Sequence, residues 1–568
     1  MTAGACRLFA VLAMLFVPVV AAAQVIPPSA QPGRERQQFA EPPAPRAQPG
    51  GESISLPSTV APQGAERIML TVARVVITGA TVYSDADLAP LYADLIGGEV
   101  SLAAVYDLAR RITAKYGAAG YVLSRAIVPP QNFGRRGATI HIQVVEGYVD
   151  EVIWPVEKLT RYRDFFTNYA ARIVADRPAN IRTLERYLLL ANDLPGLKFS
   201  TTLKPSPHHP NASILIVEVK EKTFDGTARI DNRGSSSRGP WEYLGSATVN
   251  NALGLHESFN VTYAGTAILR ELQYVQANYR QVLNSEGLTF FADASYGTGK
   301  PKIPPAVISG LDGYMTRSTI AEAGLSYPVI RSRETNLTLT GLGFLTNDNA
   351  FANGGPWTQD RIRGFRLKGD ADWADRWLGI NQVNVTFSQG LHVLGATPNA
   401  DPNVLPPLPT PTTNAGRTDF NKIEGTISRT QPLPMNFSFF VAGYAQYGFT
   451  PLLVSEQCSY GGRFFGRAFD PSQMLADRCW EVLAEGRYDI ATPWKQVTKL
   501  QLYAFADHGE LFNILPAAGT PTWQSGSSVG AGVRFGWQDT YTADFSVAKA
   551  VEGPTADWRA FIILAAKY

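Results

Sequence analysis

The chain has 568 residues, which is enough for several domains or for one large barrel with small additions. Its 51 basic and 49 acidic residues give a formal net charge of only +2. Because they form no dominant basic block, the composition argues against a protein that binds nucleic acid.

The first 23 residues are typical of a secretory signal peptide. Arg7 supplies a positive charge, residues 8–20 are apolar, and three alanines precede Gln24 as small residues precede a cleavage site. The alternative is a membrane anchor, but the apolar stretch is short for a span. We expect cleavage, so that the mature chain starts near Gln24 outside the cytoplasm.

Residues 24–66 are rich in Pro, Gln, Gly and Ala and are predicted to form a linker. Residues 33–41, GRERQQFAE, are compatible with a short helix inside it. The sequence gives this segment no packing partner, so disorder is the default expectation.

Two small α+β modules are predicted next. In residues 67–150, a strand at 67–84 is followed by helical spacing at 87–98, an amphipathic helix at 101–121 and two strands at 121–130 and 139–147. Residues 151–224 repeat the plan, with a strand at 151–158, helices at 162–174 and 181–194, and strands at 197–205 and 212–222.

From residue 225 to the C-terminus, helical periodicity gives way to short alternating stretches. In residues 288–296, LTFFADASY, apolar side chains share one face and Thr289, Asp293 and Ser295 lie on the other. About 16 such strands fit the region, which predicts a closed antiparallel transmembrane barrel. A soluble β-sandwich would also alternate, but the export signal, the aromatics near strand ends and the terminal FIILAAKY, which ends at Tyr568, favour the membrane.

No constellation of residues in the sequence predicts catalysis, a metal or a cofactor. The chain lacks GxSxG, HExxH and P-loop motifs, and its six histidines are scattered. Cys6 leaves with the signal, and the remaining Cys458 and Cys479 are expected to form a disulfide in an oxidising compartment. With no histidine nearby, two thiols do not complete a tetrahedral metal site.

Each part of the chain carries a long motif. The first module carries AAGYVLSRAIVPPQNF (118–133) and VVEG (144–147), the second carries LERYLLLANDLPGLKFSTTLKP (184–205), and the barrel opens with DNRGSSSRGPWEYLGSATVNNALGLHESF (231–259). Jointly these motifs resemble the two-partner secretion transporters of the haemolysin-activator type, a family of outer-membrane barrels with POTRA domains. The family's POTRA motif residues would be Gly120, Tyr121, Pro129, Pro130, Gln131, Glu146 and Gly147.

The resemblance, which runs from about residue 70 to the C-terminus, implies a fold and a function. Residues 67–150 and 151–224 would be two periplasmic POTRA domains, and residues 225–568 an outer-membrane barrel. The POTRA domains would bind an unfolded, secreted partner protein, by strand addition for example, and the barrel would export it without ATP. Outer-membrane lipid and the barrel assembly machinery are the other expected partners. The first alternative function is an insertase for other barrels, and the second, less favoured one is a general porin.

The resemblance also implies a hairpin near residues 450–479 that folds into the lumen. Arg467 and Phe469 match the family's Val-Arg-Gly-aromatic tip, with Gly466 in place of Val and Ala468 in place of Gly. In the family the arginine pairs with an aspartate of a Phe-x-Asp-x-Gly strand, which is Asp507 here. Alternation places Asp507 opposite an apolar face, hence toward the lumen, where a guanidinium is a suitable partner. The alternative is a solvated carboxylate.

The two cysteines flank this hairpin. A disulfide between Cys458 and Cys479 would close a loop of about twenty residues and stabilise the folded chain by roughly 3 kcal/mol. It would act either as a staple that restricts hairpin motion or simply as a stabiliser of an exposed loop.

Overall fold

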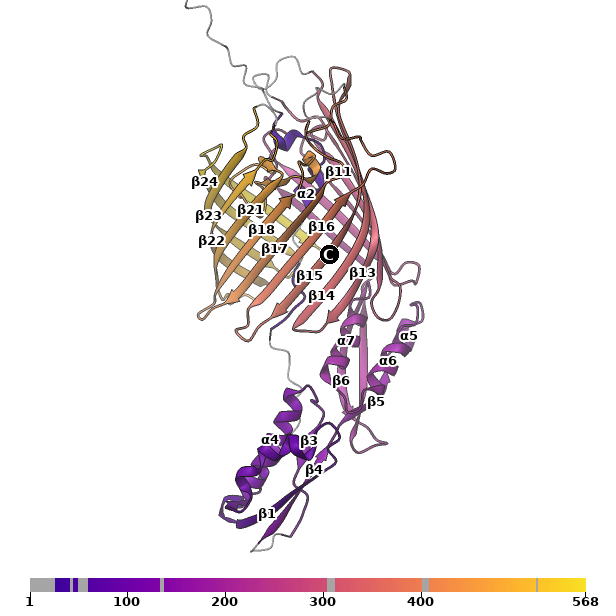
Figure 1. Ribbon diagram of the computed structural model, residues 1–568, viewed down its shortest axis with the longest axis vertical. Coiled ribbons are helices and arrows are strands. Elements are labelled where there is room, and N and C mark those ends of the chain that lie inside the picture. The colour runs from indigo at the N-terminus through magenta and orange to yellow at the C-terminus, as the bar shows by residue number, and fades with distance from the viewer. Residues whose placement is uncertain are drawn as a thin grey trace, which may run out of the picture.

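The computed structural model describes residues 26–40, 44–49, 60–132, 137–303, 312–400, 408–516 and 519–568. The predicted signal peptide, with Cys6, lies outside the described residues. Two small sheets, each with its helices, lie below a large barrel (Figure 1). Among the described helices, none is both long and apolar enough to cross a membrane.

The first sheet lies farthest from the barrel and has the strand order β2-β1-β4-β3. Helix α4 packs its apolar side chains on this sheet, because Val105, Leu108 and Ile112 recur at helical spacing and are fully buried. Its elements are β1 (Met69–Thr78), α3 (Asp85–Leu88), β2 (Glu99–Ser101), α4 (Leu102–Ala118), β3 (Arg125–Ile127) and β4 (Ala138–Val145).

The second sheet has the order β5-β7-β6, with the parallel pair β5–β7 in the position that β1–β4 take in the first sheet. Strand β5 already begins at Tyr148, so the two sheets divide near residue 147 and not at the expected 150. Residues 156–158, expected in the strand, belong to helix α5 instead. The elements are β5 (Tyr148–Ile153), α5 (Val156–Leu159), α6 (Phe166–Ala175), α7 (Ile181–Asn192), β6 (Leu197–Pro205) and β7 (Ala212–Glu221).

Sixteen of the described strands close into one antiparallel barrel, as the alternation predicts. The ring closes where β25 pairs with β8. The strands are β8 (Phe224–Asp231), β9 (Glu242–Asn250), β10 (Glu257–Thr266), β11 (Gln273–Val282), β12 (Thr289–Gly299), β13 (Met315–Arg331), β14 (Thr335–Ala352), β15 (Gly355–Ala374), β16 (Ile380–Gly390), β17 (Asn421–Pro432), β18 (Phe437–Gly448), β21 (Arg478–Asp489), β22 (Val497–Phe512), β23 (Trp523–Trp537), β24 (Tyr541–Glu552) and β25 (Trp558–Lys567).

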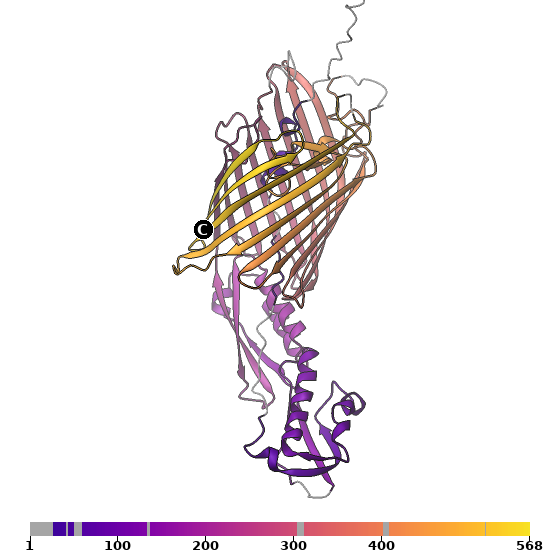
Figure 2. The ribbon, with the colours of Figure 1, turned by 90° about the vertical axis from the view of Figure 1, so that its left-hand side faces the viewer.

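The strands cross the barrel wall at a tilt, and the second sheet meets the lower rim (Figure 2). Side chains alternate along each strand between an exposed outer row and a buried inner row. On β22, Leu502 is exposed, whereas Gln501 and Asp507 face inward and are buried. A lipid-facing outer row and a polar inner row are what a transmembrane barrel needs.

The N-terminal segment is ordered inside the barrel, so the expectation of disorder was wrong for its described residues. A 3-10 turn, η1 (Pro28–Ala30), precedes the short helix α2 (Glu35–Phe39), which Figure 1 shows within the barrel wall. Ala30, Arg34 and Phe39 are buried. The lumen supplies the packing partners that the sequence of the segment does not reveal. We call residues 26–40 the plug.

Candidate functional site

The chain between β18 and β21 turns back into the barrel as a hairpin. Two short strands, β19 (Cys458–Tyr460) and β20 (Met474–Ala476), pair along its arms, and residues 461–473 form its tip. Phe469 at the tip is buried and packs on Tyr460 at 5.5 Å between ring centroids. The lumen is therefore filled from one side by this hairpin.

Asp507 on β22 holds the backbone of the hairpin tip. Its carboxylate accepts hydrogen bonds from the N–H groups of Gly466 at 3.0 Å and Arg467 at 3.4 Å. The hydroxyls of Tyr460 and Ser528 also donate to it. With four donors, the buried carboxylate is fully paired and fixes the tip against the wall.

The guanidinium of Arg467 pairs with Glu485, not with Asp507, so the expected ion pair was wrong. Its Nη1 lies 2.5 Å from Glu485 Oε2, and the group stacks on Phe505 at 4.4 Å. Across β21 and β22, Glu485 pairs with Phe505, and Leu483 with Asp507. The long side chain reaches past Asp507 over the Phe505 ring, while its own backbone N–H stays on Asp507.

Glu485 is the centre of a compact charged cluster that the sequence analysis missed. It is fully buried and forms ion pairs with three arginines: Arg467, Arg487 at 2.7 Å and Arg534 at 2.7 Å. The only sequence signal was its place on the inward face of an alternating strand. A buried carboxylate surrounded by cations is paired well enough to offset its desolvation.

Within the tip motif, residues 466–469, the left-handed backbone position lies at Gly466 and not at residue 468. Gly466 has φ +66°, and a Cβ there would lie 2.6 Å from the backbone nitrogen of Gly461. Ala468, which replaces the family's glycine, is absent from the described residues with positive φ and is buried. The position of this motif that needs a glycine is therefore residue 466, and the backbone at residue 468 accommodates alanine.

Cys458 and Cys479 form a disulfide, with their Cα atoms 6.4 Å apart. Cys458 begins the inner strand β19, whereas Cys479 belongs to the wall strand β21 and pairs with Leu511 of β22. The bond therefore ties one arm of the hairpin directly to the barrel wall.

Three consecutive charged residues of the plug reach three different partners. Arg34 donates to the carbonyls of Val454 and Gln457 in the hairpin at 3.1 and 3.0 Å. Glu35 pairs with Arg238 at 3.1 Å, and Arg36 with Glu322 on β13. In the sequence, the charge pattern of GRERQQF is the signal for such contacts. The partners of these charged residues can be identified only from the fold.

A further hairpin residue, Arg463, joins the plug to the first barrel strands. Its guanidinium pairs with Asp231 at 2.8 Å and Glu242 at 2.6 Å, and donates to the carbonyl of Gln38 at 3.4 Å. Plug and hairpin thus hold one another through Arg34 and Arg463. A cavity of about 890 Å³ remains beside them, toward Arg280 and Lys368 on the opposite wall.

The predicted POTRA motif residues lie at the joint between the two small sheets. Gly120, with φ +95°, leaves room for the Asn180 side chain and accepts a hydrogen bond from the Ile181 N–H at 2.8 Å. A Cβ on Gly147 would lie 2.2 Å from the carbonyl oxygen of Leu123. Gly120 therefore allows a close contact between the two domains, and Gly147 allows two segments of the first domain to approach closely. The Gly147 carbonyl also accepts a hydrogen bond from the Ala179 N–H of the second domain at 2.9 Å.

Other motif residues stabilise the first domain itself. Glu146 accepts hydrogen bonds from the Thr81 N–H and the Tyr116 hydroxyl, both at 2.7 Å. Burial opposes the charge, but these bonds hold the pKa of Glu146 below its ordinary value. Gln131, after Pro129 and Pro130, bonds both backbone groups of His141. Tyr121 packs edge-on against Tyr116.

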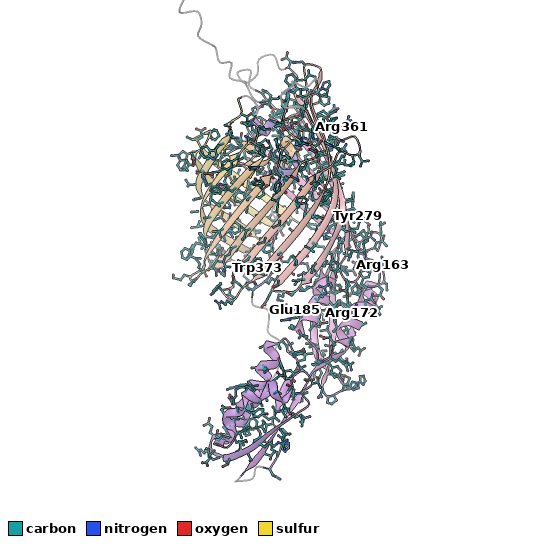
Figure 3. All side chains as sticks on the ribbon, in the orientation of Figure 1. Arg163, Arg172, Glu185, Tyr279, Arg361 and Trp373 are labelled. Carbon is teal, nitrogen blue, oxygen red and sulfur yellow. A yellow bond between two sulfur atoms is a disulfide. The ribbon has the colours of Figure 1, made fainter. Side chains whose placement is uncertain are left out.

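The second domain is fastened to the lower rim of the barrel. Arg331 pairs with Asp193 at 2.7 Å, and Arg186 with Glu286 at 3.3 Å. The turn between β9 and β10 inserts the fully buried His256 against Phe165. Figure 3 labels Glu185 and Arg172 on the helices of this domain, just below the rim. At the same rim, where the ring of strands closes, Tyr568 exchanges two backbone hydrogen bonds with Gly226, and its side chain is exposed.

A metal or catalytic centre is not evident in this arrangement. Among the described residues, no group of three or more His, Cys, Asp or Glu side chains is placed to hold a metal ion. The lumen of the barrel is occupied by the plug and the hairpin. Both are held by the polar contacts described above and by apolar clusters around Phe39 and Phe469.

Two family profiles match the sequence. Residues 211–534 match "Haemolysin secretion/activation protein ShlB/FhaC/HecB", and residues 70–147 match "POTRA domain, ShlB-type". The outer membrane transporter CdiB of Dickeya dadantii is 22% identical over 430 residues, 74% of this chain and 72% of that protein. The hemolysin transporter protein ShlB of Serratia marcescens is 27% identical over 197 residues, 34% of this chain and 33% of that protein.

A solved structure shares the fold. CdiB from Escherichia coli superposes with a TM-score of 0.70 at 18% identity, covering 91% of this chain and 94% of that chain. At this identity the likeness concerns the architecture alone.

Proposed function

The chain belongs to the haemolysin secretion/activation protein family ShlB/FhaC/HecB, and we propose how its plug, hairpin and POTRA domains carry out secretion. The protein is an outer-membrane transporter of two-partner secretion, not an enzyme, and its partner is a secreted protein. The family match over more than half of the chain is the observation that carries this conclusion.

In our proposal, the two periplasmic domains receive the partner in unfolded form. Each sheet has edge strands, such as β6 in the order β5-β7-β6, which pair with another strand on one side only. An extended segment can add to such an edge through backbone hydrogen bonds. Fastened to the lower rim through Arg331 and His256, the second domain would hold this segment beside the pore entrance.

The plug must then leave the lumen for the partner to pass. Its contacts include ion pairs and hydrogen bonds of Arg34, Glu35 and Arg36, which water and the incoming chain can replace. Arg467, Phe469 and Asp507 would keep the hairpin on the opposite wall, so that the conduit opens on the side of the cavity. Folding of the partner outside the cell would supply the free energy.

Two further partners are proposed. Outer-membrane lipid would cover the exposed outer rows of the strands. The exposed Tyr568 side chain, at the end of the closing strand β25, would serve as the signal read by the barrel assembly machinery.

Deletion of residues 60–222 tests the proposal against its alternatives. The cells should co-express the secreted partner protein, and its amount in the medium should be measured. A two-partner transporter loses export while its barrel still reaches the outer membrane. A porin would keep uptake of small solutes, and loss of an insertase would deplete other outer-membrane barrels.

A further inference from the structure

The outer wall of the barrel carries an unusual basic surface on β13–β15. Arg317 and Arg361 are exposed on the outward rows of β13 and β15. Arg363 belongs to the same outward row but is covered, because it donates to the carbonyls of Leu394 at 3.3 Å and Thr346 at 2.9 Å. We call Arg317, Arg361 and Arg363 the rim arginines.

Their height on the wall follows from the length of β15. Twelve residues separate Arg361 from Trp373, which lies on the same outward row near the lower rim (Figure 3). At about 3.3 Å per residue and a tilt of about 40°, they differ in height by about 30 Å. The apolar band of such barrels is only about 25 Å tall. Since Trp side chains concentrate at the membrane interfaces, we take Trp373 as the inner edge of the band. Arg361 then lies just above its outer edge, among lipid headgroups.

This part of the wall presents no acidic side chain outward among the described residues. The outward neighbours of the rim arginines across the strands are amides, since Arg317 pairs in register with Asn349 and Arg361 with Asn347. The acids of these strand ends, Asp348 and Asp360, face the lumen and are buried. The positive charge of Arg317 and Arg361 is thus uncompensated by the described protein.

The opposite wall carries charges of both signs near the same end of the barrel. There Glu510 and Glu552 face outward and accept hydrogen bonds from Trp480 and Ser525. Two basic residues, Arg478 and Lys549, lie on the outward rows of the same wall. The basic surface is consequently a local feature of β13–β15 and not a property of the whole rim.

An exposed aliphatic loop lies against the rim arginines. The chain after β16 returns along β15, with the Leu391 N–H donating to the Arg363 carbonyl at 2.7 Å. Val393 and Leu394 are 47% and 81% exposed, although this loop is fastened to the wall. The outward row just below, with Phe365 and Leu367, is apolar and exposed, so the loop continues the lipid-facing surface upward.

We propose that this surface is a binding site for a phosphorylated lipid of the outer leaflet. Arg317 and Arg361 lie two strands apart, with Cα atoms about 12 Å from each other by strand geometry, close enough for both guanidinium groups to reach one phosphorylated headgroup. Guanidinium groups bind phosphate in a bidentate manner. Leu391, Val393 and Leu394 contact the acyl chains, and the covered Arg363 fixes the loop that presents them.

The test is binding of lipid A, a phosphorylated glycolipid, to the full-length protein in detergent, measured by native mass spectrometry. Arg317→Gln combined with Arg361→Gln should weaken binding by about tenfold or more, since each charge-assisted contact is lost. The conservative pair Arg317→Lys and Arg361→Lys should retain most of it. Arg376→Gln is the matched control, because Arg376 is exposed in the periplasmic turn after β15.

Competition experiments distinguish a site for a phosphorylated lipid from a site for any phosphate. Inorganic phosphate in large excess should not displace lipid A, and phosphatidylethanolamine should bind equally to all variants. Displacement by phosphate would reduce the site to an anion site, and unchanged lipid A binding in the double Gln variant would overturn the proposal. If that variant fails to assemble, Leu394→Asp, at an exposed position, takes its place and should weaken lipid A binding likewise.

Discussion

The guanidinium of Arg467 lies 2.5 Å from the carboxylate of Glu485, although its own backbone N–H points to Asp507. The hairpin tip is therefore held twice, by the side chain through β21 and by the backbone through β22. These two attachments respond differently to mutation, because a side-chain substitution leaves the backbone bond in place.

A double-mutant cycle distinguishes the two attachments. Arg467→Ala and Glu485→Gln should be coupled by about 1–3 kcal/mol, whereas Arg467→Ala and Asp507→Asn should be nearly additive. The measurement is heat-dependent loss of the folded barrel on gels, together with export of the partner. Arg467→Ala should leave the barrel assembled and sharply reduce export. Strong coupling to Asp507 and none to Glu485 would contradict the observed pairing.

Restoring the family's residue at position 466 should be harmful. Gly466→Val places a branched side chain at φ +66° and within 2.6 Å of the Gly461 backbone, so the tip must rearrange. We expect export to fall well below that of Ala468→Gly, the matched control two residues away. Equal export by both variants would show that the tip tolerates another conformation.

The disulfide should contribute stability without being needed for export. Replacing Cys458 and Cys479 together by Ser removes a cross-link with a sequence separation of 21 and should cost roughly 3 kcal/mol. The temperature at which the barrel unfolds on gels should fall, and reductant should lower it in the wild type to the level of the variant. If reductant still lowered the unfolding temperature of the double Ser variant, the effect would not come from this disulfide.

The junction between the second domain and the barrel should weaken in acid. Burial lowers the pKa of His256 below its usual 6.5 against the opposing effects of the Arg163 carbonyl, Glu257 and Asp164, while the Arg163 charge reinforces the lowering. Its Nδ1 has no hydrogen-bond partner among the described residues. The docked state thus binds fewer protons, so docking is complete above pH 6.5 and is lost as the pH falls toward the lowered pKa.

Spin-label distances between the second domain and the barrel check this prediction. They should broaden between pH 7.5 and 5.5 in the wild type and stay constant in His256→Phe, which retains the ring packing against Phe165. A broadening of the same size in His256→Phe would place the titrating group elsewhere.

The sequence predicted the architecture well because alternation is a local property. The outward and inward rows of β22, the amphipathic α4 and the two repeated α+β modules can all be read within windows of about ten residues. The partners of Arg467 and the place of the plug depend on which strands face each other across the lumen. No local pattern links Arg34 to a carbonyl 420 residues later, so these contacts required the fold.

Substitutions in the plug test most directly how the pore opens. Replacing Arg34, Glu35 and Arg36 by Ala removes contacts to the hairpin, to Arg238 and to Glu322, and leaves the strands themselves untouched. If these contacts together stabilise the closed pore by about 3 kcal/mol, the open population should rise by about a hundredfold. Planar-bilayer recordings would show this as a larger open fraction. Arg46→Ala, which removes an exposed ion pair with Asp193, is the matched control and should conduct like the wild type. A triple variant as closed as the wild type would mean that apolar contacts, such as that of Phe39 with Tyr274, hold the plug in place.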